Sequence, residues 1–187
     1  MDTKERIQNC AEELFYSRGY DATGVQEIAE KSGITKPTLY HYFGSKRGLL
    51  EEIFRVRYAA FSEFMEPVLG SNEGIRGKLH RIAMDSWRFY CREYRFYILF
   101  MSLSYSPKEN EAYQVARPYL QKMHHRMAQV FEEASAELGN MNGRQEQFAT
   151  SFTGIIGQYL LEYGSAAMDH EQQIHMLVDQ YMHGIFS

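Results

Sequence analysis

The stretch TGVQEIAEKSGITKPTLYHYFGSKRGLL, residues 23–50, holds two short helical patterns on either side of a glycine. The first pattern opens with Thr23 and Gln26, which have the form of a capping box. An apolar face follows at helical spacing, and Gly33 can close the segment. That face consists of Val25, Ile28 and Ala29. We therefore expect a first helix of only two to three turns.

The second pattern begins directly after this turn. Thr35 is a suitable N-cap, and Pro37 stands in the first helical turn, where a missing N–H group costs little. Leu39 and Phe43 are spaced to point inward from one short helix. Two short helices joined by a small turn with glycine form a DNA-binding helix-turn-helix when the second helix can enter a major groove. The spacing therefore favours a helix-turn-helix.

The charge of this stretch differs from that of the whole chain, whose formal net charge is -4. Residues 31–50 contain no Asp or Glu. Their cations are Lys31, Lys36, Lys46 and Arg47. A solvated basic face would explain these charges, but it would not explain the polar and aromatic side chains beside them, which suit phosphate and base-edge contacts. Those neighbours are Thr38, Tyr40, His41 and Tyr42.

These residues resemble the DNA-binding signature of the TetR family of bacterial transcription regulators. The resemblance rests on the Ile28-Ala29 pair, Gly33, the Leu39-Tyr40-x-Tyr42-Phe43 run, Lys46 and Leu49. The motif covers about a quarter of the chain, and the rest agrees in length and helicity. Pro37 departs from the pattern because many members have Gly there, which affects the sequence preference more than the ability to bind. Ser32 replaces the commoner Ala, a small residue for a small one.

The resemblance implies roles for eight residues of this surface. Base edges would be contacted by Gln26, Lys36, Pro37, Thr38 and His41. The sugar-phosphate backbone would be held by Tyr40, Tyr42 and Lys46. These roles agree with the chemistry, since an amide can pair with adenine and an ammonium can reach guanine or a phosphate.

The remaining chain also has helical spacing, and no strand pattern or repeat is found. A helix is expected over residues 3–18, where apolar residues repeat at helical spacing after a possible Thr3 cap. Gly19 can take the left-handed C-cap conformation at its end. A further helix is expected over 46–70 after a Ser45 cap, and another from Ser71 or Asn72 through the aromatic stretch 89–105. A long helix over 109–138, with a kink or break at Pro118, is followed by a loop at 139–143. The last two helices are expected over 144–167 and 170–186. The expected fold is all-α with about nine helices. It comprises a helix-turn-helix domain at 1–46 and a ligand-binding and dimerisation domain at 47–187.

The last two helices resemble the dimerisation pair of the family, which forms a four-helix bundle with a second subunit. The apolar stripes expected at the interface are Phe148, Phe152, Ile155, Ile156, Tyr159, Ile174, Leu177, Val178, Tyr181 and Ile185. Gly154 and Gly157 would permit close approach. The alternative is that these stripes pack inside one subunit. A dimer would place two recognition helices about 34–36 Å apart, as a palindromic site requires.

An aromatic set in the body could line an effector pocket or fill a core. Its members are Trp87, Tyr90, Tyr94, Tyr97, Phe100, Met101, Tyr105, Tyr113, Tyr119 and Met123. Buried Tyr hydroxyls need partners, and aromatic walls suit flat or cationic apolar ligands. The resemblance implies that an effector tilts the long helix after Ser45 and releases the operator. The expected protein is thus a homodimeric repressor with a small-molecule effector.

Other classes of function have less support. No catalytic motif is present, so we expect neither an enzyme nor a cofactor. The residues His124, His125, His170, His175 and His183 fit solvent-facing helical histidines better than a metal site. The charged N-terminus, the short apolar run 96–103 and the isolated Cys10 and Cys91 predict a cytoplasmic protein without a membrane span. The open alternatives are an architectural or cell-division protein that coats DNA, and a small-molecule carrier.

Overall fold

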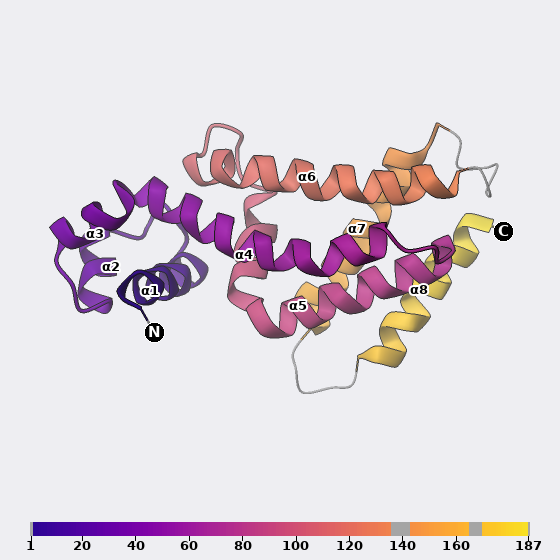
Figure 1. The fold of residues 1–187 in the computed structure, drawn as a ribbon, viewed down its shortest axis with the longest axis horizontal. Helices are drawn as coiled ribbons and strands as arrows, with labels where there is room; N and C mark the ends of the chain where they lie inside the picture. The colour runs from indigo at the N-terminus through magenta and orange to yellow at the C-terminus, as the bar shows by residue number, and fades with distance from the viewer. Residues whose placement is uncertain (1, 136–142, 165–169, 187) are drawn as a thin grey trace. The chain divides into compact units, whose positions relative to one another are not determined.

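The chain is all-α, as expected. The computed structural model describes residues 2–135, 143–164 and 170–186, with side chains as far as residue 184. In this part of the chain the helices are α1 (Thr3–Arg18), α2 (Val25–Lys31), α3 (Lys36–Phe43), α4 (Lys46–Leu69), α5 (Ile75–Leu103), α6 (Glu111–Ala134), α7 (Gln145–Tyr163) and α8 (Glu171–Phe186), as Figure 1 shows. Helix α5 is broken at Glu93, whose φ of -128° and ψ of 39° are not helical. Counting its two halves separately gives nine helices in the described ranges, where about nine were expected.

Several helix boundaries differ from the sequence-based expectation. Asp2, rather than Thr3, stands at the N-cap of α1. The expected capping box is wrong, because Gly24 is the N-cap of α2 and the Thr23 hydroxyl donates backward to the Gly19 carbonyl at 2.8 Å. Helix α5 begins only at Ile75.

Two further expectations concern α6 and the residues at the helix ends. Helix α6 runs through Pro118 without ending there, so the expected interruption is wrong. The expected loop at 139–143 and the helix ends at 138 and 167 fall wholly or mainly outside the described residues. In the described part of the chain, no helix is both long and apolar enough to cross a membrane.

The contacts divide the chain into two units that alternate along the sequence. The first unit comprises Met1–Ala59 and Glu93–Tyr119, and the second comprises Ala60–Arg92 and Leu120–Ser187. The first unit therefore contains more than the expected DNA-binding domain, because it includes parts of α5 and α6. The boundary expected near residue 46 stays a prediction.

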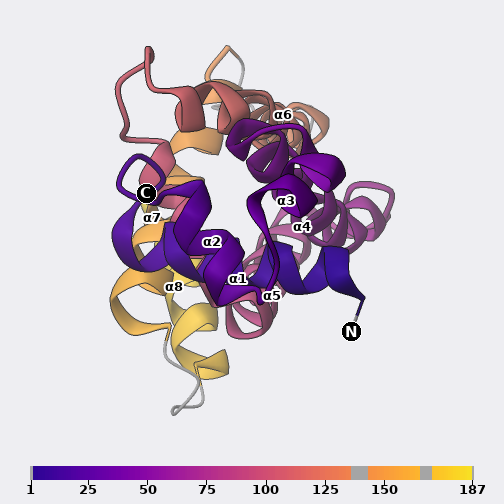
Figure 2. The ribbon, with the colours of Figure 1, turned by 90° about the vertical axis from the view of Figure 1, so that its left-hand side faces the viewer.

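In the first unit, α2 packs against both α1 and α3, and Figure 2 shows the three helices together. Their apolar faces and that of the first half of α4 supply a core of fully buried side chains. Its largest members include Ile7, Phe15, Ile28, Leu39, Leu50 and Phe54. The helical spacing that predicted these helices thus also selected their buried faces.

The second unit has its own aromatic core. The ring of Phe131 on α6 lies 5.8 Å from Phe148 and 6.4 Å from Phe152, both on α7. Phe152 in turn contacts Tyr181 of α8, with ring centroids 5.3 Å apart. Helices α6, α7 and α8 are therefore joined by ring packing within one subunit.

Candidate DNA-binding surface

The turn between α2 and α3 is built as the sequence predicts. Gly33 has a φ of 63°, which favours glycine over residues with a side chain. The Thr35 side chain then accepts a hydrogen bond from the Thr38 amide at 3.4 Å and caps α3. Leu39 is fully buried and anchors the helix. With Leu39 inward, the other faces of α3 remain open to solvent.

Six of the eight expected DNA-contacting side chains are exposed. They are Gln26, Lys36, Pro37, Tyr40, His41 and Tyr42. Tyr40 and Tyr42 are 46% and 42% exposed. Thr38 is half-buried, and its hydroxyl lies 2.9 Å from the Thr35 hydroxyl. The Gln26 amide donates to Glu30 of the same helix at 2.5 Å.

Two of the cations near the turn are held in ion pairs. Lys31 lies 2.7 Å from Glu13 of α1, and Arg47 lies 2.9 Å from Glu51 one turn further along α4. Both acidic partners come from outside the acid-free stretch, which is why sequence inspection missed them. Lys36, at the start of α3, has no ion pair among the described residues. Of these three cations, Lys36 is the one best placed to contact DNA.

Lys46 is engaged differently. Its Nζ lies 3.0 Å from the Tyr20 carbonyl oxygen and 3.1 Å from the Thr23 carbonyl oxygen, both in the turn between α1 and α2. It also lies 4.1 Å from the centre of the Tyr20 ring. The Tyr20 hydroxyl donates to Glu111 at the start of α6, and burial together with this hydrogen bond raises the pKa of Tyr20. The sequence analysis predicted neither the contacts of Lys46 with this turn nor the hydrogen bond between Tyr20 and Glu111.

Glu52 ties α1 to α4. Its carboxylate lies 2.6 Å from Lys4 Nζ of α1 and 2.7 Å from Arg55 Nε of α4. The hydrogen bonds from Arg55 and then Lys4 lower the pKa of Glu52 from 4.5 to about 2. Both bonds favour the charged carboxylate.

A second, more buried tie involves the break in α5. Arg57 of α4 donates to the Glu12 carboxylate of α1 at 2.7 Å and to the Asn9 side chain at 2.7 Å. It also lies 3.5 Å from the carboxylate of Glu93, the residue at which α5 departs from helical geometry. Glu12 is only 5% exposed, and burial raises its pKa despite the Arg57 hydrogen bond. One guanidinium thus joins α1, α4 and α5.

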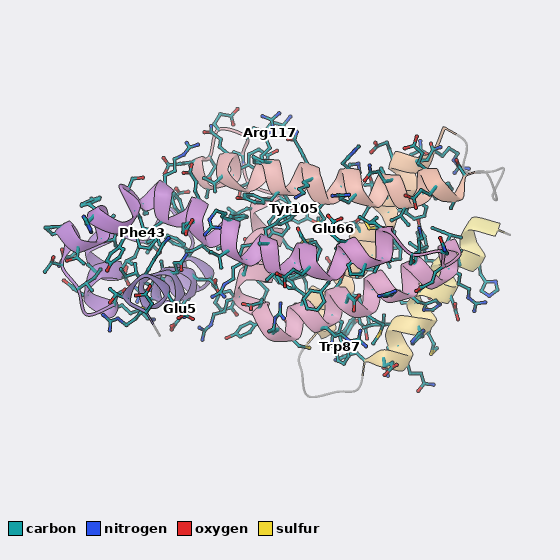
Figure 3. The ribbon with its side chains drawn as sticks, viewed as in Figure 1. Glu5, Phe43, Glu66, Trp87, Tyr105 and Arg117 are labelled. Carbon is teal, nitrogen blue, oxygen red and sulfur yellow. The ribbon has the colours of Figure 1, made fainter. Side chains whose placement is uncertain are left out.

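The first unit also contains an open cleft of about 630 Å³. Its lining residues come from α1, α3, α4 and α6, and Figure 3 labels Phe43, which lines it from the end of α3. They are Lys4, Tyr42, Phe43, Arg47, Gly48, Glu51, Glu52, Arg55, Gln114, Val115, Pro118 and Tyr119. The cleft is polar, because the ion pairs of α4 line much of it.

The expected effector residues are divided between the two units. Tyr94, Tyr97, Phe100, Met101, Tyr105, Tyr113 and Tyr119 belong to the first unit, and Trp87, Tyr90 and Met123 belong to the second. Tyr97 and Phe100 are buried, whereas Tyr105 is 82% exposed. Tyr119 packs 4.9 Å from Tyr58 and lines the cleft. An effector site formed by these residues stays a prediction.

In the second unit, the indole nitrogen of Trp87 and the hydroxyl of Thr153 are buried without a described partner. The Trp87 indole nitrogen on α5 is buried and has no hydrogen-bond partner among the described residues (Figure 3). The Trp87 ring lies 6.0 Å from the ring of His170. His170 is 3% exposed and lies 3.0 Å from the Tyr159 hydroxyl, so the expectation that it faces solvent is wrong. In the described part of the chain, no three His, Cys, Asp or Glu side chains are grouped to hold a metal ion.

The expected dimer residues separate into a buried and an accessible group. Phe148, Phe152, Ile156, Ile174 and Val178 are buried in the core of their own unit. Ile155, Tyr159, Leu177 and Tyr181 keep accessible surface. The side chain of Ile185 lies outside the described residues. A partner could therefore contact only the second group without opening the core.

Beside the accessible group, α7 carries an open groove of about 510 Å³. Two rows at four-residue spacing line it: Gly154, Gln158 and Glu162 in one, and Ile155, Tyr159 and Tyr163 in the other. Tyr163 is 58% exposed. The i, i+4 repeat was visible in the sequence, but its orientation away from the core was not.

The fold and this surface define a helix-turn-helix protein with a helical body. Residues 7–53 match the family model for bacterial regulatory proteins of the tetR family. The transcriptional repressor NemR of Escherichia coli K12 is 32% identical over 73 residues, which are 39% of this chain and 37% of NemR. Residues 7–53 of the chain are thus similar to the DNA-binding region of this family. The match with NemR spans little more than a third of that relative, in keeping with a shared DNA-binding region.

Solved structures share the whole fold. FadR of Bacillus subtilis, in complex with stearoyl-CoA, has a TM-score of 0.78 at 18% identity and covers 96% of this chain and 98% of its own. AibR, in complex with isovaleryl coenzyme A and operator DNA, has a TM-score of 0.76 at 21% identity over 96% and 97% of the two chains. The body thus has the arrangement of known regulators in spite of its low sequence identity.

Proposed function

We propose that this protein is a transcriptional repressor that binds a palindromic operator as a homodimer and releases it on binding a small effector. The observation that carries the proposal is helix α3, which is anchored by a fully buried Leu39 and displays exposed Lys36, Tyr40 and Tyr42 within the family match. An exposed row of cationic and aromatic side chains on a rigid second helix suits base and phosphate contacts.

The DNA contacts proposed from this geometry are the exposed residues of α2 and α3. Gln26, Lys36, Pro37 and His41 would face base edges, and Tyr40 and Tyr42 would contact phosphates. Thr38 would contribute its methyl group, because its hydroxyl already lies against Thr35. The dimer would use the accessible side of α7 and α8, and the protein would act in the cytoplasm.

The deciding experiment is a salt-titrated fluorescence anisotropy assay. It compares DNA flanking the protein's own gene with random DNA of equal length. We expect tight binding to the flank, with two subunits or a multiple of two per site. The logarithm of the affinity should fall linearly with the logarithm of the salt concentration. Equal binding to both DNAs, or protection of many scattered sites, would contradict a dedicated repressor and favour a DNA-coating protein. Absence of salt-dependent binding would favour a carrier.

Acyl-CoA compounds are the first effectors to test, since two proteins of the same fold were solved with such ligands. In this chain, the Trp87 indole N–H has no partner among the described residues and offers a buried donor beside aromatic surface. Isovaleryl-CoA, stearoyl-CoA and free CoA would be titrated into the preformed operator complex. An inducer must bind the DNA-free state more tightly, and a hundredfold preference corresponds to about 2.7 kcal/mol. Equal affinity for free and DNA-bound protein would exclude induction by that compound.

A further inference from the structure

The first residue of α4, Lys46, makes contacts that do not fit a phosphate-binding side chain. An ammonium group has three N–H donors. Here carbonyl oxygens at 3.0 and 3.1 Å accept two of them, and the Tyr20 ring lies 4.1 Å away. Lys46 is also half-buried, unlike the exposed Lys36 at the start of α3. With two N–H groups bonded to carbonyl oxygens and the Tyr20 ring beside the ammonium, Lys46 is already engaged within the protein.

The two carbonyl groups belong to the turn that leads into the helix-turn-helix. The Tyr20 carbonyl also accepts the Thr23 amide at 3.2 Å, and the Thr23 hydroxyl donates to the Gly19 carbonyl at 2.8 Å. Tyr20 itself is 4% exposed. Lys46 therefore links the start of α4 to a buried turn, immediately before α2 begins at Val25. This link connects both ends of the helix-turn-helix, because α2 and α3 lie between the turn and Lys46.

We propose that Lys46 is a positioning residue that holds the turn of residues 19–24 against α4, so that α3 is presented to DNA in the correct orientation. The inference rests on the proposed function and changes the role of one residue within it. Without the ammonium, two buried carbonyl groups lose a charged donor. A smaller fraction of the helix-turn-helix domains then holds the orientation that binds DNA. Apparent affinity falls in proportion to that fraction, whereas the number of phosphates contacted stays the same.

The test compares Lys46→Met with wild type in salt-titrated operator binding. Lys46→Met keeps most of the apolar stem and removes the charge. We expect affinity to fall at least about tenfold at every salt concentration, with an unchanged slope of log affinity against log salt. A slope that becomes shallower by about 0.9 per bound subunit would show a lost phosphate contact and overturn the proposal. Unchanged affinity would overturn it as well.

A second measurement needs no DNA. Hydrogen exchange of the full-length protein reports on the turn, since the Thr23 amide is bonded to the carbonyl that Lys46 also binds. We expect exchange in residues 19–24 to be at least about tenfold faster in Lys46→Met. The matched control is Arg47→Met, which removes the same charge one residue later but leaves the turn intact. Exchange in residues 19–24 that is equally slow in both variants would overturn the proposal.

Conservative variants separate positioning from a general loss of folding. Lys46→Arg can still donate to both carbonyl oxygens and should restore both affinity and slow exchange. Lys46→Gln keeps one donor group and serves if Lys46→Met fails to fold. If wild type binds no operator, the proposed function fails, and hydrogen exchange still decides whether Lys46 holds the turn. If wild type binds and the variants match it, the proposed function stands and this inference fails.

Discussion

Lys36 combines exposure with the lack of an ion pair among the described residues, at the start of a helix that the fold leaves open. A cation of this kind can reach the guanine acceptors O6 and N7. We predict that Lys36→Ala lowers operator affinity by about 1–3 kcal/mol and changes affinity for random DNA little. Anisotropy on both DNAs measures the difference. Equal losses on the two DNAs would contradict a base-reading role for Lys36.

Gly48, in the first turn of α4, is needed for the close approach of α3. A Cβ atom at this position would lie 2.1 Å from the Phe43 carbonyl oxygen, which is part of the backbone. We predict that Gly48→Ala lowers the free energy of unfolding by about 1–3 kcal/mol, because the junction must open to fit the methyl group. Thermal and urea unfolding provide the measurement.

The control for this substitution is Gly77→Ala in α5. An added Cβ there would lie 3.3 Å from the end of the flexible Glu73 side chain. Alanine is the better helix former, so Gly77→Ala should leave stability unchanged or raise it by up to about 1 kcal/mol. Similar destabilisation by both substitutions would show that the Phe43 carbonyl is not the cause.

At the scale of elements, the link between α1 and α4 should control stability in acid. The pKa of Glu52 is lowered to about 2, so the folded state favours its charged form. The stabilisation is therefore complete above pH 4.5 and is lost as the pH falls from about 4.5 to about 2. We predict that Glu52→Gln is less stable than wild type at neutral pH and that the difference shrinks through this window. Urea unfolding at a series of pH values measures it.

Glu51→Gln is the matched control, because Glu51 pairs with Arg47 of the same helix and forms no ion pair with a second element among the described residues. Its difference from wild type should be small, as is usual for exposed pairs within one helix. If Glu52→Gln and Glu51→Gln respond to acid alike, the tie between α1 and α4 is not the source of the stabilisation.

The break in α5 and the continuity of α6 through Pro118 show the limits of local signals. Pro118 predicted a kink or an interruption, and helix α6 is not interrupted there, whereas nothing in the sequence around Glu93 predicted the break that α5 does make. Glu93 instead lies within 3.5 Å of Arg57, which also binds the buried Glu12. A carboxylate among the buried positions of α1 is a signal that sequence inspection could have used, since buried charges need partners.

At the scale of the whole molecule, the groove on α7 indicates which side of the helix a second subunit would cover. Ile155 is 36% exposed there, beside Tyr159 and Tyr163. We predict that Ile155→Glu shifts the protein toward monomers and weakens operator binding, because a buried unpaired charge is costly. Sedimentation equilibrium measures the shift.

The control is Val56→Glu, which places the same charge on an exposed apolar position of α4 in the other unit. It should leave the oligomeric state unchanged. A dimer that persists in Ile155→Glu would place the interface elsewhere, and a wild-type monomer would contradict the proposed dimer altogether.

The sequence by itself determined the all-α class, the turn between α2 and α3, the Thr35 cap and the resemblance of residues 7–53 to the tetR family. These features depend on spacing and on residues close together in the chain, which local physical rules describe. Only the tertiary structure decided which cations remain available, since Glu13 and the Tyr20 carbonyl engage Lys31 and Lys46 across the fold. It also decided which half of the α7 and α8 stripes is core, because periodicity shows that a helix has an apolar face but not which neighbour covers it.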